Sequence, residues 1–198
     1  MTHSIRCHCG KLKGTLTCNQ EVNRCVCYCA DCQAFARFLK CEHNILDEMG
    51  GTSIIQTIPA NVTFTEGTEN LTCIRLKPNG LLRWYTTCCN TPIGNTPPTL
   101  NPSFIGLIHT CLSSDQTSLD KAFGPIRMYV NTKSAIGENK PESAGILSGT
   151  LRVIGMMLKA RFDGRYKQTP FFVIESGTPI IAPKVLNDEE LKNVKNAV

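Results

Sequence analysis

Four cysteines, Cys25, Cys27, Cys29 and Cys32, fall within eight residues of this chain. A short loop cannot bury so many thiols as packing, but it can direct their sulfur atoms at one soft cation. Three of them have the spacing Cys27-x-Cys29-x-x-Cys32, which supplies three thiolates to a tetrahedral ion. We therefore predict a metal site at this triplet and expect the ion to be Zn²⁺.

The fourth position at this zinc decides its chemistry. If Cys25 is the fourth ligand, the site is closed and structural. If a water or a substrate thiol takes that position, the site is open. Three thiolates leave Zn²⁺ with a net negative charge, which makes it a poor activator of water but a good partner for an incoming sulfur. The sequence leaves both alternatives open.

A second group of thiols is distributed over distant parts of the chain. Cys7 and Cys9 form a Cys-x-Cys pair followed by Gly10, a residue that lets the backbone turn around an ion. Cys88 and Cys89 lie at the end of a predicted hairpin. We expect these four cysteines to form a structural zinc site that fastens the first strand to the hairpin. The alternative for the first pair is two buried thiols at the start of a strand.

The two groups together resemble the glutathione-dependent formaldehyde-activating enzyme family, which also includes centromere protein V. The resemblance covers roughly residues 1–112. It implies a zinc-ribbon-related β-tent fold, a structural zinc held by the first pair together with a late cysteine pair, a catalytic zinc at the triplet, and carbon–sulfur lyase chemistry on glutathione and formaldehyde. The pattern consists of Cys7-x-Cys9-Gly10, Cys27-x-Cys29-x-x-Cys32, Arg83, and Cys89-Asn-Thr-Pro-Ile93.

This sequence departs from the family pattern in two respects. The late pair should be Cys-x-x-Cys-Gly, but Thr86 stands where its first cysteine should be and Asn90 stands in place of the glycine. Cys89 matches the second cysteine, and Cys88 is the candidate to replace the missing ligand. An incomplete site is the alternative. In addition, residues 125–198 lie outside the pattern.

The elements that must position these cysteines are mostly strands, so we predict a mainly β chain that is α+β overall. Asn79-Gly80 between two apolar runs predicts a β-hairpin. A short helix is expected over 33–40, directly after the triplet. Strands are predicted near 12–18, 52–58, 62–65, 71–77, 81–85, 104–111, 126–131 and 171–174.

We divide the chain into a zinc-binding β domain, 1–124, and an extension, 125–198, that packs on it as strand, helix, strand and helix. The extension contains an amphipathic helix, expected over 141–163, and a final helix introduced by the capping box of Asn187 and Glu190. The first helix is predicted from an apolar stripe spaced 4, 3, 4 and 4: Leu147, Leu151, Ile154, Leu158 and Phe162.

Composition limits the location and the partners of the protein. The chain has no apolar run long enough to span a membrane and no apolar core of signal-peptide length near Met1. We therefore expect a cytoplasmic, reducing compartment, where clustered cysteines bind metal, and no membrane partner. The net charge is +5, and residues 125–198 carry +4 of it. Basic residues in or after the predicted helix form either a solvated face or a basic rim for an anionic partner.

Three functions follow from these observations. The first is a carbon–sulfur lyase-like enzyme that acts on a small thiol such as glutathione, or on its aldehyde adduct. The second is a non-catalytic zinc module that binds a protein or nucleic acid. The third is purely structural zinc. The sequence offers no strong catalytic base, because Asp31 is expected in a solvated loop and His8, His43 and His109 have no catalytic context. It specifies neither the substrate nor the oligomeric state.

Overall fold

The computed structural model describes residues 1–18, 22–112 and 116–196. Its helices are α1 (Ala30–Phe38), α2 (Glu42–Ile45), α3 (Gln116–Phe123), α4 (Ile146–Phe162) and α5 (Asp188–Asn196), with short 3-10 helices η1 (Pro59–Asn61), η2 (Thr68–Asn70), η3 (His109–Cys111), η4 (Thr132–Ser134) and η5 (Arg165–Lys167). Its strands are β1 (Thr2–Arg6), β2 (Lys13–Thr17), β3 (Asn23–Cys27), β4 (Thr52–Thr57), β5 (Val62–Glu66), β6 (Leu71–Arg75), β7 (Leu82–Thr86), β8 (Pro92–Thr96), β9 (Ile105–Ile108), β10 (Met128–Val130) and β11 (Lys184–Val185). The expected mainly β, α+β fold with a helix-containing extension is confirmed.

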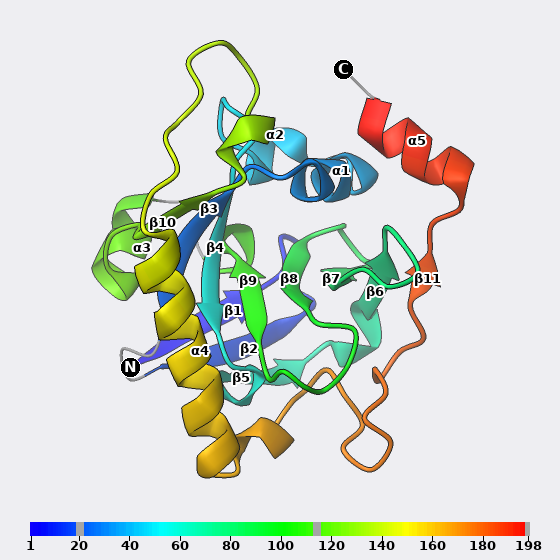
Figure 1. Ribbon diagram of the computed structural model, residues 1–198. Coiled ribbons are helices and arrows are strands. Elements are labelled where there is room, and N and C mark those ends of the chain that lie inside the picture. The colour runs from blue at the N-terminus through cyan, green and yellow to red at the C-terminus, as the bar shows by residue number, and fades with distance from the viewer. Residues whose placement is uncertain (19–21, 113–115, 197–198) are drawn as a thin grey trace.

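Among the described residues the strands form two sheets (Figure 1). A small sheet has the order β1-β2-β5, and a large mixed sheet has the order β10-β3-β4-β9-β8-β7-β6-β11. The two edge strands of the large sheet, β10 and β11, both come from the part of the chain after residue 125. Each pairs in parallel with its neighbour, β10 with β3 and β11 with β6. The strand that carries Cys25 and Cys27 therefore lies next to a strand of the extension.

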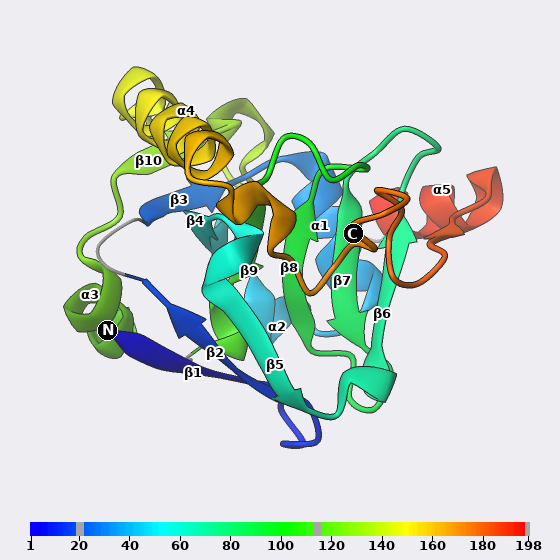
Figure 2. The ribbon, with the colours of Figure 1, turned by 90° about the horizontal axis from the view of Figure 1, so that it is seen from below.

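The large sheet is covered on both faces. Successive residues of a strand point to opposite sides, so neighbouring residues of one strand belong to different cores. Cys73 and Leu107 belong to a core shared with β1, β2, β5 and the fully buried Trp84. Their neighbours Ile74 and Ile108 belong to a second core under α1 and α2. Figure 2 shows the small sheet lying beside the large one. This arrangement brings the loop after β1 close to the loop after β7.

The hairpin of β6 and β7 is confirmed, but its turn differs from the expected one. The Gly80 N–H donates to the Lys77 carbonyl at 3.0 Å, so the central residues of the turn are Pro78 and Asn79. Proline at the first central position presets the backbone for such a turn. The strand expected over 171–174 is wrong, because only an isolated bridge joins Phe172 to Pro179. Phe171 and Phe172 are both buried in the first core instead of alternating between two faces.

The final helix α5 follows the predicted capping box. The Asn187 N–H donates to Glu190 Oε2 at 3.0 Å, and the Glu190 N–H donates to Asn187 Oδ1 at 2.8 Å. Leu191 and Val194 lie inward against the core under α1, as expected. Within the described ranges, no helix has both the length and the apolar character needed to cross a membrane.

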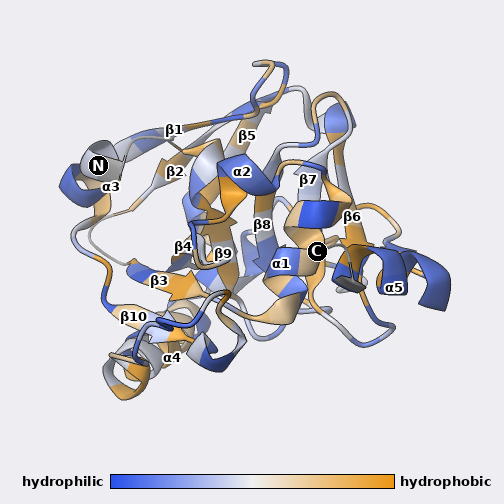
Figure 3. Ribbon diagram, turned by 90° about the horizontal axis from the view of Figure 1, so that it is seen from above, coloured by the Kyte–Doolittle hydropathy of each residue, from blue (hydrophilic) through white to orange (hydrophobic). Residues whose placement is uncertain are grey.

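The helix α4 forms within the predicted range, although it begins at Ile146 and not near residue 141. It turns its apolar stripe towards solvent. Leu147 is 75% exposed, Leu151 59%, Leu158 52% and Phe162 87%. In Figure 3 the apolar colouring of α4 lies at the edge of the molecule. The face that packs on the sheet has smaller or slimmer side chains, which allow the helix to approach β3 and β10 closely. These residues are Gly149, Val153, Met156 and Ala160.

Two glycines of α4 test this orientation. A Cβ atom at Gly149 would lie 2.6 Å from Met128 Sδ, whereas nothing lies within 4 Å of the corresponding position at Gly155. We expect Gly149→Leu to destabilise the protein by about 1–3 kcal/mol through overpacking. Gly155→Leu should stabilise it by up to about 1 kcal/mol, because leucine is the better helix former. Urea unfolding of both variants measures the difference. Equal effects at the two positions would contradict the observed packing of α4.

Candidate metal centres

The triplet lies where β3 ends and α1 begins. Cys27 is the last residue of β3, Cys29 caps the N-terminus of α1, and Cys32 lies in its first turn. The three Sγ atoms all lie within 4.8 Å of one another. The helix begins at Ala30, earlier than expected, because the Cys29 sulfur accepts a hydrogen bond from the Cys32 N–H at 3.3 Å. The motif therefore forms the start of the helix as well as the group of sulfurs.

Two side chains from other strands donate hydrogen bonds to these sulfurs. Asn131 Nδ2, just after β10, lies 3.3 Å from Cys27 Sγ. The buried guanidinium of Arg83, on β7, lies 3.9 Å from Cys32 Sγ and also donates to Asn95 Oδ1 at 3.3 Å. Donors of this kind favour thiolates over thiols. Reasoning from the residues missed Asn131 and Asn95, because no local pattern marks them, and named Arg83 only through the family resemblance.

The three thiols of the triplet compete for one negative charge. Hydrogen bonds from Cys29 and Cys32 lower the pKa of Cys27 to about 2, and the same contact with Cys27 raises the pKa of Cys29 and of Cys32. The pKa of Cys25 is raised to about 12, mainly by burial and further by the negative charge of the nearby Cys27 and Cys29. Cys25 is buried within β3 and does not belong to the group of three.

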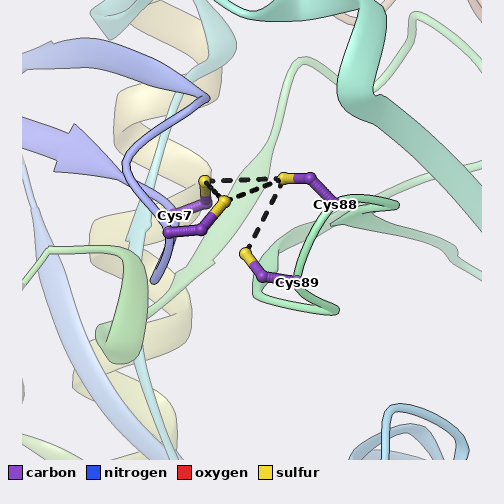
Figure 4. A group of neighbouring side chains, drawn as sticks. Cys7, Cys88 and Cys89 are labelled. Atoms are coloured by element: carbon purple, nitrogen blue, oxygen red, sulfur yellow. Dashed lines mark hydrogen bonds between the residues drawn. The ribbon is translucent and has the colours of Figure 1, made fainter.

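The second group joins two loops that are about 80 residues apart in sequence. Cys7 and Cys9 lie between β1 and β2, and Cys88 and Cys89 lie between β7 and β8; all four sulfurs are within 4.8 Å of one another. Cys88 Sγ is 3.3 Å from Cys9 Sγ, 3.8 Å from Cys7 Sγ and 3.7 Å from Cys89 Sγ. Figure 4 shows Cys7, Cys88 and Cys89 pointing towards one another. Four sulfurs around Zn²⁺ at about 2.3 Å would be spaced about 3.8 Å apart, so these separations suit the ion.

The structure accounts for the two residues, Thr86 and Asn90, by which the late cysteine pair departs from the family pattern. Asn90 has a φ of 54°, the left-handed conformation that glycine would otherwise supply and that asparagine tolerates. Thr86 remains beside the group, with its Oγ1 atom 3.5 Å from Cys89 Sγ. Burial alone would raise the pKa of Cys89, but hydrogen bonds with Thr86 and Thr91 outweigh it and lower that pKa to about 5. Cys88 occupies the place near Cys7 and Cys9 that a fourth sulfur requires.

The remaining candidates are engaged elsewhere. Asp31 Oδ1 lies 3.5 Å from Lys195 Nζ of α5. His109 Nδ1 contacts the Ser53 carbonyl at 3.3 Å, and burial lowers the pKa of this histidine. Within the described residues, neither cysteine group includes a His, Asp or Glu side chain. All twelve cysteines are unbridged, so none of the grouped sulfurs is consumed by a disulfide.

The fold and these two sites define a mainly β protein with two cysteine groups that could each bind a metal ion. The chain belongs to the family of unknown function DUF6151, which matches residues 2–182. No curated protein matches it. A crystal structure of a Rhodobacter sphaeroides protein is similar, with 19% identity and a TM-score of 0.38, over 64% of this chain and 97% of that one. A likeness of this size supports no statement about fold or function. None of these comparisons names the glutathione-dependent formaldehyde-activating family.

Proposed function

We propose that this protein binds two zinc ions, one in a closed structural site and one in an open site that acts on sulfur. Cys7, Cys9, Cys88 and Cys89 hold the first. Cys27, Cys29 and Cys32 hold the second. The observation that carries the proposal is that three sulfurs converge at the start of α1 while the nearby Cys25 stays outside their group.

The donor sets fit zinc better than other common ions. Thiolates are soft ligands that select zinc, copper(I) or iron–sulfur clusters over calcium, magnesium or manganese. At the triplet, Asn131 and Arg83 place N–H groups against Cys27 and Cys32. Outer contacts of this kind orient ligands and typically change metal affinity by about 10–100-fold. A divalent cation would also remove the competition of three close thiols for one charge.

The reaction that suits the triplet is the making or breaking of a carbon–sulfur bond between a small thiol and an aldehyde. In the forming direction the sulfur lone pair makes the C–S bond while the π bond of the aldehyde C=O breaks and its electron pair moves to oxygen. The S–H bond also breaks, and its proton ends on that oxygen. Zinc, when bound, would hold the substrate sulfur as a thiolate. The triplet itself would leave one coordination position for that sulfur. Glutathione and formaldehyde are the substrates that the family resemblance implies.

A non-catalytic zinc module is the second candidate, and the surroundings of the triplet favour it in one respect. Asp31, the carboxylate within the motif, is paired with Lys195 and is not part of the sulfur group. Such a protein would keep its zinc closed to external thiols. Binding of glutathione sulfur at the triplet therefore separates the two functions.

Cobalt substitution provides that test. With Co²⁺ in both sites, adding glutathione should increase the sulfur-to-cobalt charge-transfer absorption saturably, by the contribution of about one further thiolate at the open site. S-methylglutathione, which lacks the thiol, is the matched control and should change nothing. Metal content after gel filtration checks that glutathione has not removed the ion. A spectrum that does not respond to glutathione would support the closed, non-catalytic alternative.

A further inference from the structure

The outward stripe of α4 is an apolar feature of the described surface that the metal sites do not explain. Its members Leu147, Leu151, Ile154, Leu158 and Phe162 are all exposed and recur at intervals of three and four residues. Monomeric proteins rarely leave contiguous apolar patches of more than about a few hundred Å² uncovered. The spacing matches the seam that one helix presents to another.

A groove runs beside this stripe. Ile154 and Met157 of α4 form one wall, and Pro97, Pro102 and Phe104 form part of the other, around a cavity of about 260 Å³. Pockets for drug-sized molecules usually measure about 300–1,000 Å³, so this one suits the inserted side chains of a macromolecule better. The groove widens the apolar surface on one side of the stripe.

The charges of α4 are all positive. The helix carries Arg152, Lys159 and Arg161 and no acidic residue. Arg161 follows Ile154 and Met157 on the groove side, at the spacing of one helix face. Arg152 and Lys159 are seven residues apart and border the stripe on its other side. Cations therefore flank the apolar surface on both sides.

From these observations we propose that α4 and its groove bind an acidic amphipathic helix of another protein. The apolar face of that helix would pack on the stripe and insert side chains into the groove, and its carboxylates would face the flanking cations. A second copy of this chain would instead bring two sets of cations to one seam. A flat bilayer would cover the stripe but leave the groove unfilled. This inference is independent of the metal sites.

A synthetic peptide helix tests the proposal on the whole 198-residue chain. The probe has leucines at i, i+4, i+7 and i+11 and glutamates on both flanks; a second peptide has lysines in place of the glutamates. Fluorescence anisotropy should show that the acidic peptide binds at least about tenfold more tightly than the basic one, and less tightly as salt is raised. Arg152→Glu should reduce the difference between the two peptides.

Exposed-site variants locate the binding surface. Leu151→Gln and Leu158→Gln should each weaken binding of the acidic peptide at least about tenfold, as expected at the centre of an interface. The control variant is Ile180→Gln, because Ile180 is 42% exposed and lies outside α4. This variant should bind the acidic peptide as tightly as the wild type does. Circular dichroism and zinc content verify that each variant is folded.

Four results would each overturn the proposal. One is no binding of the acidic peptide, and another is equal binding of both peptides. A third is light scattering that shows dimers of the wild type but not of Leu151→Gln, which would assign the surface to a second copy. The fourth is tight binding to phosphatidylserine vesicles, lost in the same variant, without selective peptide binding. That result would assign the surface to a membrane.

Discussion

Replacing Cys88 by serine is expected to remove one zinc ion per chain and to destabilise the whole fold. The four sulfurs of this group connect the β1–β2 loop of the small sheet to the β7–β8 loop of the large sheet. Structural zinc contributes about 10–16 kcal/mol to the folding of small zinc-finger peptides. Losing one ligand should therefore cost about 4 kcal/mol or more, which lowers the Tm by about 8–16 °C in a chain of this size.

A matched control is available for that measurement. Cys41 is half-buried like Cys88 but lies outside both groups, and its thiol donates to the Leu39 carbonyl, a contact that a serine hydroxyl can keep. Cys41→Ser should cost less than about 1 kcal/mol and leave the zinc content unchanged. Differential scanning calorimetry and elemental analysis measure both quantities. If Cys88→Ser behaves like Cys41→Ser, Cys88 is not a structural ligand.

Replacing Cys29 by serine should abolish turnover and leave the fold intact. The Cys29 sulfur caps α1, and serine is among the best residues at that position, so the start of the helix is preserved. The substitution removes one of the three sulfurs of the triplet. We expect the rate of exchange between glutathione, formaldehyde and their adduct, followed by NMR, to fall at least about 100-fold, which is about 2.7 kcal/mol in the activation free energy.

Cys25→Ala is the comparison for this experiment. Cys25 lies on the same strand as Cys27 but outside the sulfur group, so its loss should leave both the second zinc ion and turnover in place. Full activity of Cys29→Ser would refute the proposed role of the triplet. Loss of the second zinc ion from Cys25→Ala would instead show that the site is closed and structural.

Local sequence was enough to predict the hairpin of β6 and β7, the capping of α5, the cysteine triplet, and the strands β2, β4, β5, β9 and β10, but it missed β1, β3, β8 and β11. Each of these depends on residues that are close together in the chain: alternating apolar positions, an Asn-Gly pair between two apolar runs, a capping box, or a short ligand spacing. The compartment, the division at residue 124 and the identity of the metal stay predictions. For α4 the apolar period predicted a helix, but it could not say which of two stripes faces the sheet.

The amino-acid sequence alone shows which segments carry sulfur, and it indicates how most of these segments fold locally. Tertiary structure decided what surrounds those sulfurs. Cys88 reaches Cys7 and Cys9 because the small sheet packs against the large one, and Asn131 reaches Cys27 because β10 pairs with β3. Contacts between segments so distant in sequence depend on how strands pair and how sheets pack, and no local spacing encodes them. For the same reason, only the folded chain shows that the apolar stripe of α4 faces outward.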